Sequence, residues 1–498
     1  MAAHAPADPD AEAPLSDEEL KRRTSSSLFL VSTRGIIVMI VGFGGNVVLA
    51  HMLTPEDFGV IAIGMAILLV GQMVSDGGLG AALIRRAEPP QLRELAALTA
   101  LQLAASAFVV VIAAAIAAAI GGEAWVIGLM VLSLPFLTLQ LPGRVMLERS
   151  VRFGPMAGVE ITQVVVHNVA AIALVAAGLG VWGFAVAVVL RAIASTLVMT
   201  RVSPVGLVRP RWDWPLVQPL VGFGLRYQGF TATWLLRDQL LNGAIAIVAS
   251  VATLGLWSLA KRIMELPYLF LRSIWRVAFP AMSRVVASGE DVAPLIERAA
   301  GIAAVSTGTM LVALAGSAPG LIPGVFGEPW REAAVIIPWA CLGVGIGGTV
   351  SAATQGYLYA VGDAGVVLRA GVLQAIAWFV VTLPLLPAVG PAAIGLGWVA
   401  SGIAEAIVLA RATGRRIEVR LTRTILPPLA IGVVSGAAGW FASTQGGADL
   451  LAGLAGGIIA VACFHGGLLL VERPLMRQTF DLVVTSLRTR RSPSSEAR

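Results

Sequence analysis

The stretch that decides the architecture of this chain is residues 27–86, which read SLFLVSTRGIIVMIVGFGGNVVLAHMLTPEDFGVIAIGMAILLVGQMVSDGGLGAALIRR. Two apolar runs flank the short polar turn Thr54-Pro55-Glu56-Asp57, and each run is long enough to cross a hydrocarbon core of ~30 Å. Thr54 is a good helix cap, Pro55 suits the first helical position, and the two carboxylates favour the positive end of the helix dipole. The stretch therefore predicts two membrane-spanning helices joined by a tight turn.

The rest of the chain repeats this pattern. Of its 498 residues, 57% are hydrophobic and only 13% are charged, which excludes an ordinary soluble domain. Apolar runs of about 20 residues recur along its whole length. We therefore expect an all-α integral membrane protein with about fourteen transmembrane helices. Their approximate limits are 26–51, 56–84, 93–120, 124–146, 156–178, 181–201, 222–249, 254–284, 293–320, 331–359, 365–387, 391–411, 423–443 and 448–471.

The orientation follows from the basic residues between these runs. Lys and Arg concentrate in every second loop, and among the other loops only Arg331 is an exception. Cytoplasmic loops carry the excess of Lys and Arg, so both termini are expected in the cytoplasm. The basic residues behind the net charge of +6 thus set the orientation of the spans in the membrane. We expect membrane lipids as a partner and no nucleic acid.

The expected organisation is two six-helix lobes followed by two additional helices. The lobes repeat weakly: Gln163 and Arg201 of the first match Gln374 and Arg411 of the second. Both copies begin on the cytoplasmic side, which predicts a parallel repeat about a pseudo-two-fold axis. The expected parts are a disordered cytoplasmic N-terminus (1–25), an N-terminal lobe (26–201), an amphipathic cytoplasmic linker (202–221), a C-terminal lobe (222–411), two further transmembrane helices (412–472) and a basic cytoplasmic tail (473–498).

Motifs for catalysis are missing from the sequence. There is no phosphate-binding loop, no His-Glu-x-x-His and no nucleophile elbow. Cys341 and Cys463 stand alone in separate apolar runs. We expect no catalytic residue, no metal and no cofactor, and hence a protein that is not an enzyme.

The span 254–284 carries an unusual row of charge. A charge at the centre of a span costs ~2.5–3.5 kcal/mol on insertion scales, so it normally faces a cavity or a partner. Spacings of 4, 7 and 4 place four charged residues on one helix face, with Arg262 beside them. These four residues are Lys261, Glu265, Arg272 and Arg276. The surplus of cations favours an anionic ligand, and Pro267 predicts a kink or local opening.

Structural explanations for these charges stay open. Lys261 and Glu265 can neutralise each other as i,i+4 neighbours, and Arg276 can extend its head to the cytoplasmic surface. Arg34 in the first span is a further candidate for anion binding, with the same surface alternative.

Five residues are candidates for ion coupling or gating. Asp76 closes the second span and can equally pair with Arg85 or a loop Arg. Glu160 and His167 share a face with Gln163 and can form a proton relay, or simply an interhelical hydrogen-bond cluster. The other two, Asp238 and Glu265, lie in the spans 222–249 and 254–284.

Two further charged residues within expected spans can have either a functional or a structural role. Arg237, next to Asp238 in mid-span, is either an anion-binding residue or half of an ion pair that holds the bundle together. Glu405 is an isolated acid in the span 391–411.

Two motifs carry a resemblance to a known family. The turn Leu-Thr-Pro-Glu-Asp-Phe-Gly (53–59), followed some twenty residues later by Ser-Asp-Gly-Gly-Leu-Gly (75–80), resembles the polysaccharide transporter family. This family holds the Wzx-type flippases of lipid-linked oligosaccharides, within the superfamily of the MATE exporters and the lipid II flippases. The segment 146–153, Met-Leu-Glu-Arg-Ser-Val-Arg-Phe, is similar to the family's junction between helices four and five, although Ser150 replaces its usual Glu or Leu.

The resemblance implies a flippase for a polyprenyl-diphosphate-linked oligosaccharide in the bacterial inner membrane. Its product would serve O-antigen (lipopolysaccharide), capsule or exopolysaccharide assembly, with a polymerase and a chain-length regulator as candidate partners. Two other functions are alternatives: a MATE-like multidrug or cation exporter, which predicts an acidic cavity, and a membrane polymerase or glycosyltransferase, which needs carboxylates on a sizeable periplasmic loop.

Overall fold

The computed structural model describes residues 35, 37–85, 88–150, 152–446 and 449–476. These ranges are helical throughout apart from short connections, and no strand occurs in them. The all-α class is therefore confirmed. Arg34, residues 1–25 and most of the basic tail lie outside the described residues, as does the start of the first expected span. Its described part contains the apolar helix Ile37–Ala50.

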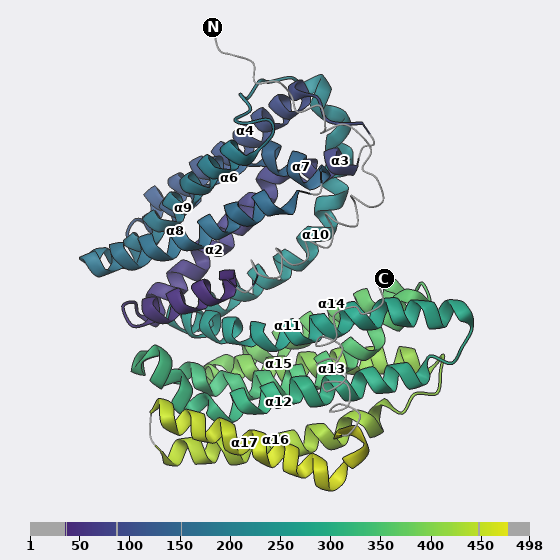
Figure 1. The fold of residues 1–498 in the computed structure, drawn as a ribbon. Coiled ribbons are helices and arrows are strands. Elements are labelled where there is room, and N and C mark those ends of the chain that lie inside the picture. The colour runs from purple at the N-terminus through teal and green to yellow at the C-terminus, as the bar shows by residue number, and fades with distance from the viewer. Residues whose placement is uncertain (1–34, 36, 86–87, 151, 447–448, 477–498) are drawn as a thin grey trace, which may run out of the picture. The chain divides into compact units, whose positions relative to one another are not determined.

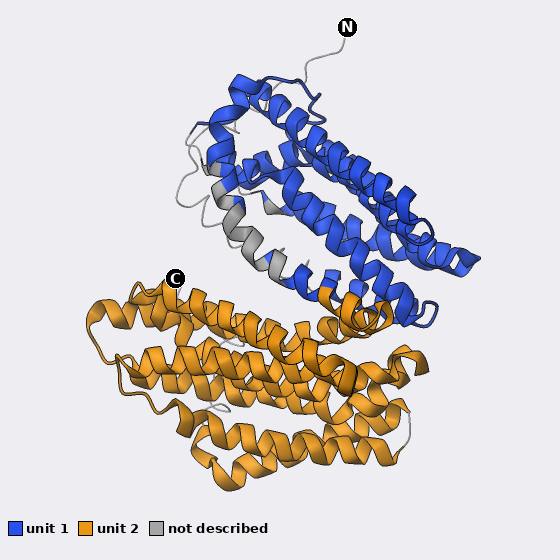
Figure 2. Ribbon diagram, turned by 180° about the vertical axis from the view of Figure 1, so that it is seen from behind, with its two compact units in different colours: residues 1–243 blue, residues 244–498 orange. Residues whose placement is uncertain are grey.

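The chain forms two compact units, residues 1–243 and 244–498 (Figure 2). The helices of the first unit (Figure 1) are α2 (Pro55–Asp76), α3 (Leu79–Arg85), α4 (Leu92–Ile120), α5 (Ala124–Val131), α6 (Leu134–Thr138), α7 (Leu141–Arg149), α8 (Phe153–Leu174), α9 (Gly180–Val202) and most of α10 (Trp214–Val248). Those of the second are α11 (Val251–Ser288), α12 (Ala293–Phe326), the 3-10 helix η3 (Glu328–Val335), α13 (Ile336–Ala360), α14 (Ala364–Val389), α15 (Ala392–Gly414), α16 (Leu421–Gln445) and α17 (Leu450–Val471).

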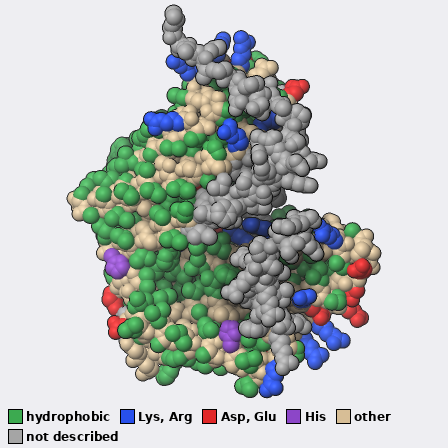
Figure 3. Space-filling view, viewed as in Figure 1, with side chains coloured by type: hydrophobic (Ala, Val, Ile, Leu, Met, Phe, Trp, Pro, Cys, Tyr) green, Lys and Arg blue, Asp and Glu red, His purple; other side chains and the backbone are tan. Residues whose placement is uncertain are grey.

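Length and composition identify the chain as a multi-pass membrane protein. Within the described ranges, nine helices are long and apolar enough to cross a membrane, or ten if the pair Ala124–Thr138 and Leu141–Arg149, bent by 48°, forms one span. Hydrophobic side chains cover the middle of the face drawn in Figure 3, and charged side chains lie mainly toward its edges. The expected spans after the first lie on helical segments, but 56–84 and 124–146 are divided among several helices. The expected spans 222–249 and 254–284 lie on α10 and α11, which are not among these nine helices.

The stretch Gly154–Val202 is counted as one of these nine helices, although it contains the two expected spans 156–178 and 181–201. Between α8 and α9 the chain reverses at Gly178 and Gly180, whose φ angles of +90° and +52° lie in the left-handed region. A residue with a Cβ rarely adopts such angles, whereas glycine does so at little cost. The two helices then pack along each other as a hairpin.

The turn before α2 folds as its sequence predicts. Thr54 Oγ1 accepts a hydrogen bond from the Asp57 amide at 3.2 Å, and the Asp57 carboxylate accepts one from the Thr54 amide at 2.8 Å. Pro55 occupies the first turn of the helix. This reciprocal capping box satisfies two amides that the helix itself leaves without partners.

Glycines allow α12, α16 and α17 to approach closely. A Cβ built on Gly453 of α17 would lie 2.3 Å from the Leu321 amide nitrogen of α12, and one on Gly439 of α16 would lie 2.4 Å from the Gly456 carbonyl oxygen of α17. Lipid is as apolar as a leucine side chain, so helices in a membrane associate through such close van der Waals packing.

We expect Gly453→Ala to destabilise the protein by about 1–3 kcal/mol, because the new methyl group meets backbone atoms that cannot move aside. The matched control is Gly466→Ala on the same helix, where a Cβ meets nothing within 4 Å. Thermal unfolding in detergent measures both variants. Equal melting temperatures for the two would show that the contact between α12 and α17 is loose.

Candidate functional site

The charged face of α11 is the first candidate site. As expected, the helix places Lys261, Glu265 and Arg272 in one row, which Arg276 continues toward the C-terminal end of α11. Lys261 is half-buried, and Glu265, Arg272 and Arg276 are exposed. Arg262 is also exposed and interacts electrostatically with Glu265. The face therefore presents several cations on a helix whose opposite side is the buried core of the unit.

The helix α11 is not interrupted at Pro267, where a kink or local opening is expected. The helix continues through Pro267 and Pro280 to Ser288. Pro267 removes one amide donor, and its ring is buried on the inner side of the helix. An unbroken helix keeps the row of charged side chains aligned over its whole length.

Three other predicted residues belong to the first unit, residues 1–243. Arg34 is outside the described residues. The backbone of Arg237 is part of α10, but its side chain is outside the described part of the structure. Asp238, the next residue, is half-buried and belongs to the first unit.

The second candidate site is a helix break between α2 and α3, at Asp76, Gly77 and Gly78. The Asp76 carboxylate accepts a hydrogen bond from the Gly78 amide at 3.2 Å. The Gly78 φ angle is +69°, and a Cβ on this residue would lie 2.3 Å from the carbonyl oxygen of Gly224 in α10. Only glycine fits both conditions.

Side chains of two other helices donate hydrogen bonds to backbone carbonyls near the break. Gln102 of α4, almost fully buried, donates to the Asp76 carbonyl at 2.9 Å. Gln228 of α10 donates to the Met73 carbonyl at 2.9 Å. The Met73 carbonyl also accepts a hydrogen bond from the Gly77 amide at 3.1 Å. Carbonyls next to a break in a transmembrane helix need partners within the protein because lipid offers none.

The segments 75–80 and 146–153 approach each other near this break, where Glu148 of α7 interacts electrostatically with Asp76. Arg149 of α7 donates to the carbonyls of Leu83 at 2.9 Å and Ile84 at 3.3 Å, near the end of α3. Arg144 of α7 interacts electrostatically with both Asp76 and Glu148. Asp76 thus faces a cation of α7, whereas the side chain of Arg85, one of its expected partners, lies outside the described part.

Glu160 and His167 lie on α8 and are half-buried. Between them, Gln163 donates to Gln140 Oε1 at 3.4 Å, and the His167 ring packs edge-on against Phe184 at 4.8 Å. Gln140 in turn donates to Ser195 Oγ at 2.8 Å and to Thr196 Oγ1 at 3.1 Å. The described contacts of this face therefore include the interhelical cluster that was the alternative to a proton relay.

A similar cluster surrounds Glu405 in the second unit. Its carboxylate accepts hydrogen bonds from Gln374 of α14 at 3.1 Å and from Gln355 of α13 at 3.4 Å. The matching amide of the first unit is Gln163, and Ser195 of α9 corresponds to Glu405 at nearly the same offset in the sequence. The acid that looked isolated in the sequence is thus part of a network between three helices.

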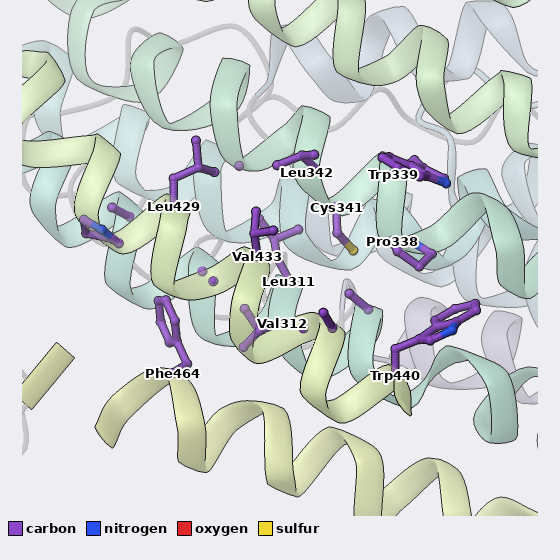
Figure 4. A pocket seen from close by; sticks show the side chains of 18 of the residues that line it. Leu311, Val312, Pro338, Trp339, Cys341, Leu342, Leu429, Val433, Trp440 and Phe464 are labelled. Carbon is purple, nitrogen blue, oxygen red and sulfur yellow. The ribbon is translucent and has the colours of Figure 1, made fainter. Parts of the chain in front are cut away.

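The second unit also holds an apolar cavity of about 600 Å³ between α12, α13 and α16 (Figure 4). Aliphatic and aromatic side chains dominate its lining, among them Leu311, Leu342, Val433, Trp440 and Phe464. A cavity with so few polar groups suits an apolar ligand.

Sequence reasoning missed several residues of these clusters: Gln102, Gln140, Arg144, Gln228 and Gln355. Glutamines within apolar runs are the only signal that points to most of them. That signal does not show which helix supplies the partner.

Known structures share this fold. The lipid II flippase MurJ, in an inward closed conformation, superposes with a TM-score of 0.69 at 13% identity, over 90% of this chain and 100% of that chain. A multidrug resistance MATE family transporter in an inward-facing conformation superposes with a TM-score of 0.52 at 14% identity, over 80% of this chain and 98% of that chain. No curated protein matches the sequence. The fold is therefore that of the MurJ and MATE membrane transporters.

The family follows from the sequence itself. Residues 48–335, more than half of the chain, match the model of a family described as "Polysaccharide biosynthesis protein". The chain belongs to this family, and the resemblance drawn from its motifs is confirmed. The match extends well beyond those motifs.

We expect Glu405→Ala to destabilise the protein by roughly 1–2 kcal/mol, because Gln355 and Gln374 lose a shared acceptor inside the helix bundle. Glu405→Gln retains one acceptor oxygen and is expected to lose less. Thermal unfolding of both variants in detergent checks the order. An Ala variant as stable as the wild type would show that the two amides find other partners.

Proposed function

We propose that the protein is a flippase that moves a polyprenyl-diphosphate-linked oligosaccharide across the bacterial inner membrane. The observation that carries this proposal is the exposed, cation-rich face of α11, a helix long enough to span the bilayer. A diphosphate is a dense anion, and Arg guanidinium groups bind phosphate oxygens through paired hydrogen bonds. Membership of a polysaccharide biosynthesis family supports a sugar-bearing cargo.

The apolar cavity supports a lipid-linked substrate. A polyprenyl chain is a long, flexible hydrocarbon, and burying it in a hydrocarbon-lined cavity needs no polar partner. The cavity and the cationic face both belong to the second unit. This unit thus offers one surface for each half of an amphiphile.

Transport is proposed to occur by alternating access, with the head group crossing while the polyprenyl tail stays in apolar surroundings, partly in the cavity and partly in lipid. The break at Asp76 is a suitable hinge, because Gly77 and Gly78 tolerate large changes of φ and ψ. Asp76, Glu160, His167, Asp238 and Glu265 remain candidates for coupling to an ion gradient. Both termini are proposed to be cytoplasmic, and the product would pass to a polymerase and chain-length regulator of O-antigen, capsule or exopolysaccharide synthesis.

The proposal predicts that Arg272→Ala slows translocation of a fluorescent polyprenyl-diphosphate oligosaccharide in proteoliposomes by roughly tenfold or more. The reason is the loss of a charge-assisted hydrogen bond, worth about 1.5–3 kcal/mol. Arg272→Lys retains the charge and should show an intermediate rate. Accessibility of the fluorophore to an external quencher reports the crossing.

Arg209→Ala serves as the control, because Arg209 is an exposed cation in the connection between α9 and α10. Full activity of Arg272→Ala would move the head-group site away from α11. No crossing by the folded wild type would contradict the flippase function itself and favour the export of amphiphilic drugs or a polymerase.

A further inference from the structure

The face of α11 that carries the charges also carries aromatic rings. Tyr268, Trp275 and Phe279 continue the spacing of Lys261, Glu265 and Arg272, so that charged and aromatic side chains alternate along one stripe. Trp275 is 37% exposed, and Tyr268 and Phe279 are half-buried. Aromatic residues that only anchor a transmembrane helix lie at the ends of the helix, at the two membrane–water interfaces. Tyr268, in contrast, lies near the middle of the expected span 254–284.

Each aromatic residue is held in place by a second ring. Trp398 of α15 stacks on Tyr268 at 6.4 Å between ring centres and donates from its indole nitrogen to the Tyr268 hydroxyl at 3.2 Å. Trp257, which is buried, packs edge-on against Trp398 at 5.1 Å between ring centres. Seven residues along α11, Trp275 and Phe279 form a parallel stack at 5.6 Å, and Tyr359 of α13 meets Phe279 edge-on.

These pairs make two rigid platforms, about 10 Å apart along the helix. Arg272 lies between them, and Arg276 lies beside the second. A pyranose ring has C–H groups on its faces and hydroxyl groups around its rim. The flat apolar face of an aromatic ring can stack on the C–H groups of the sugar. Guanidinium donors and carboxylate acceptors can hydrogen-bond to its hydroxyl groups. A hydrocarbon ligand, in contrast, would need neither charged side chains between the rings nor paired aromatic rings for its binding.

We propose that Tyr268 with Trp398, and Trp275 with Phe279, form a carbohydrate-binding wall that stacks against sugar rings of the transported head group. The inference rests on the proposed function and adds to it. The arginines would bind the anionic diphosphate, and the aromatic platforms would select a lipid that carries sugars over one that does not.

The test measures the affinity of the purified full-length protein, by thermophoresis in detergent, for two probes. One is a polyprenyl diphosphate that carries a short oligosaccharide, and the other is the same polyprenyl diphosphate without sugar. We expect Tyr268→Leu and Trp275→Leu to weaken binding of the glycosylated probe by about three- to tenfold, the size of one aromatic contact, and to leave the sugar-free probe unchanged. Tyr268→Phe retains the ring and should bind the glycosylated probe more tightly than Tyr268→Leu.

The matched control is Trp182→Leu, because Trp182 is an exposed tryptophan at the start of α9 and is expected to anchor that helix at the membrane surface. An equal loss of affinity for both probes in the Tyr268 and Trp275 variants, or no loss for either, would overturn the carbohydrate wall while leaving the flippase proposal intact. A wild-type protein that binds neither probe would overturn both proposals.

Discussion

A lipid bilayer supplies no hydrogen-bond partner, and this constraint governs the structure at every level. An unsatisfied backbone group in hydrocarbon costs several kcal/mol, so the described chain is helical across its apolar runs and uses tight, capped turns between them. The same constraint applies to polar side chains within those runs. Gln140 reaches Ser195 and Thr196, and Gln355 and Gln374 reach Glu405, because each amide must find its partner on another helix.

The polar groups of the two units differ in what they do. At the break between α2 and α3, Gln102 donates to the Asp76 carbonyl and Gln228 donates to the Met73 carbonyl. Arg149 donates to the Leu83 carbonyl near the end of α3. These side chains supply hydrogen-bond donors to backbone carbonyls near the interruption of the helix. On α11 the helix is unbroken, and Arg272 and Arg276 extend from its exposed side. The first arrangement suits a hinge, and the second suits a surface that meets a ligand.

The proposed substrate has three chemical parts, and the second unit has a surface suited to each. Guanidinium groups of α11 match a diphosphate, stacked aromatic pairs on the same helix face match sugar rings, and the cavity between α12, α13 and α16 matches a polyprenyl chain. The aromatic residues alternate with the charges because one helical period places both on the same face. The proposed binding surface for the head group therefore lies on α11, and rings of α15 and α13 pack against its aromatic residues.

The sequence by itself determined the helical class, the position of many of the membrane-length helices, the cap at Thr54 and the charged row on α11. These features depend on local composition and on the helical period, which act over a few turns of chain. Only the tertiary structure decided that α11 continues through Pro267, and that segments 75–80 and 146–153 approach each other near one helix break. It alone also showed that Gln355 and Gln374 hold Glu405, and that Trp398 stacks on Tyr268. Such contacts join residues far apart in the chain, and Gly or Gln in an apolar run looks the same whichever helix packs against it. Packing chooses the partner, because each helix in the bilayer must bury its small residues and satisfy its polar ones at the same time.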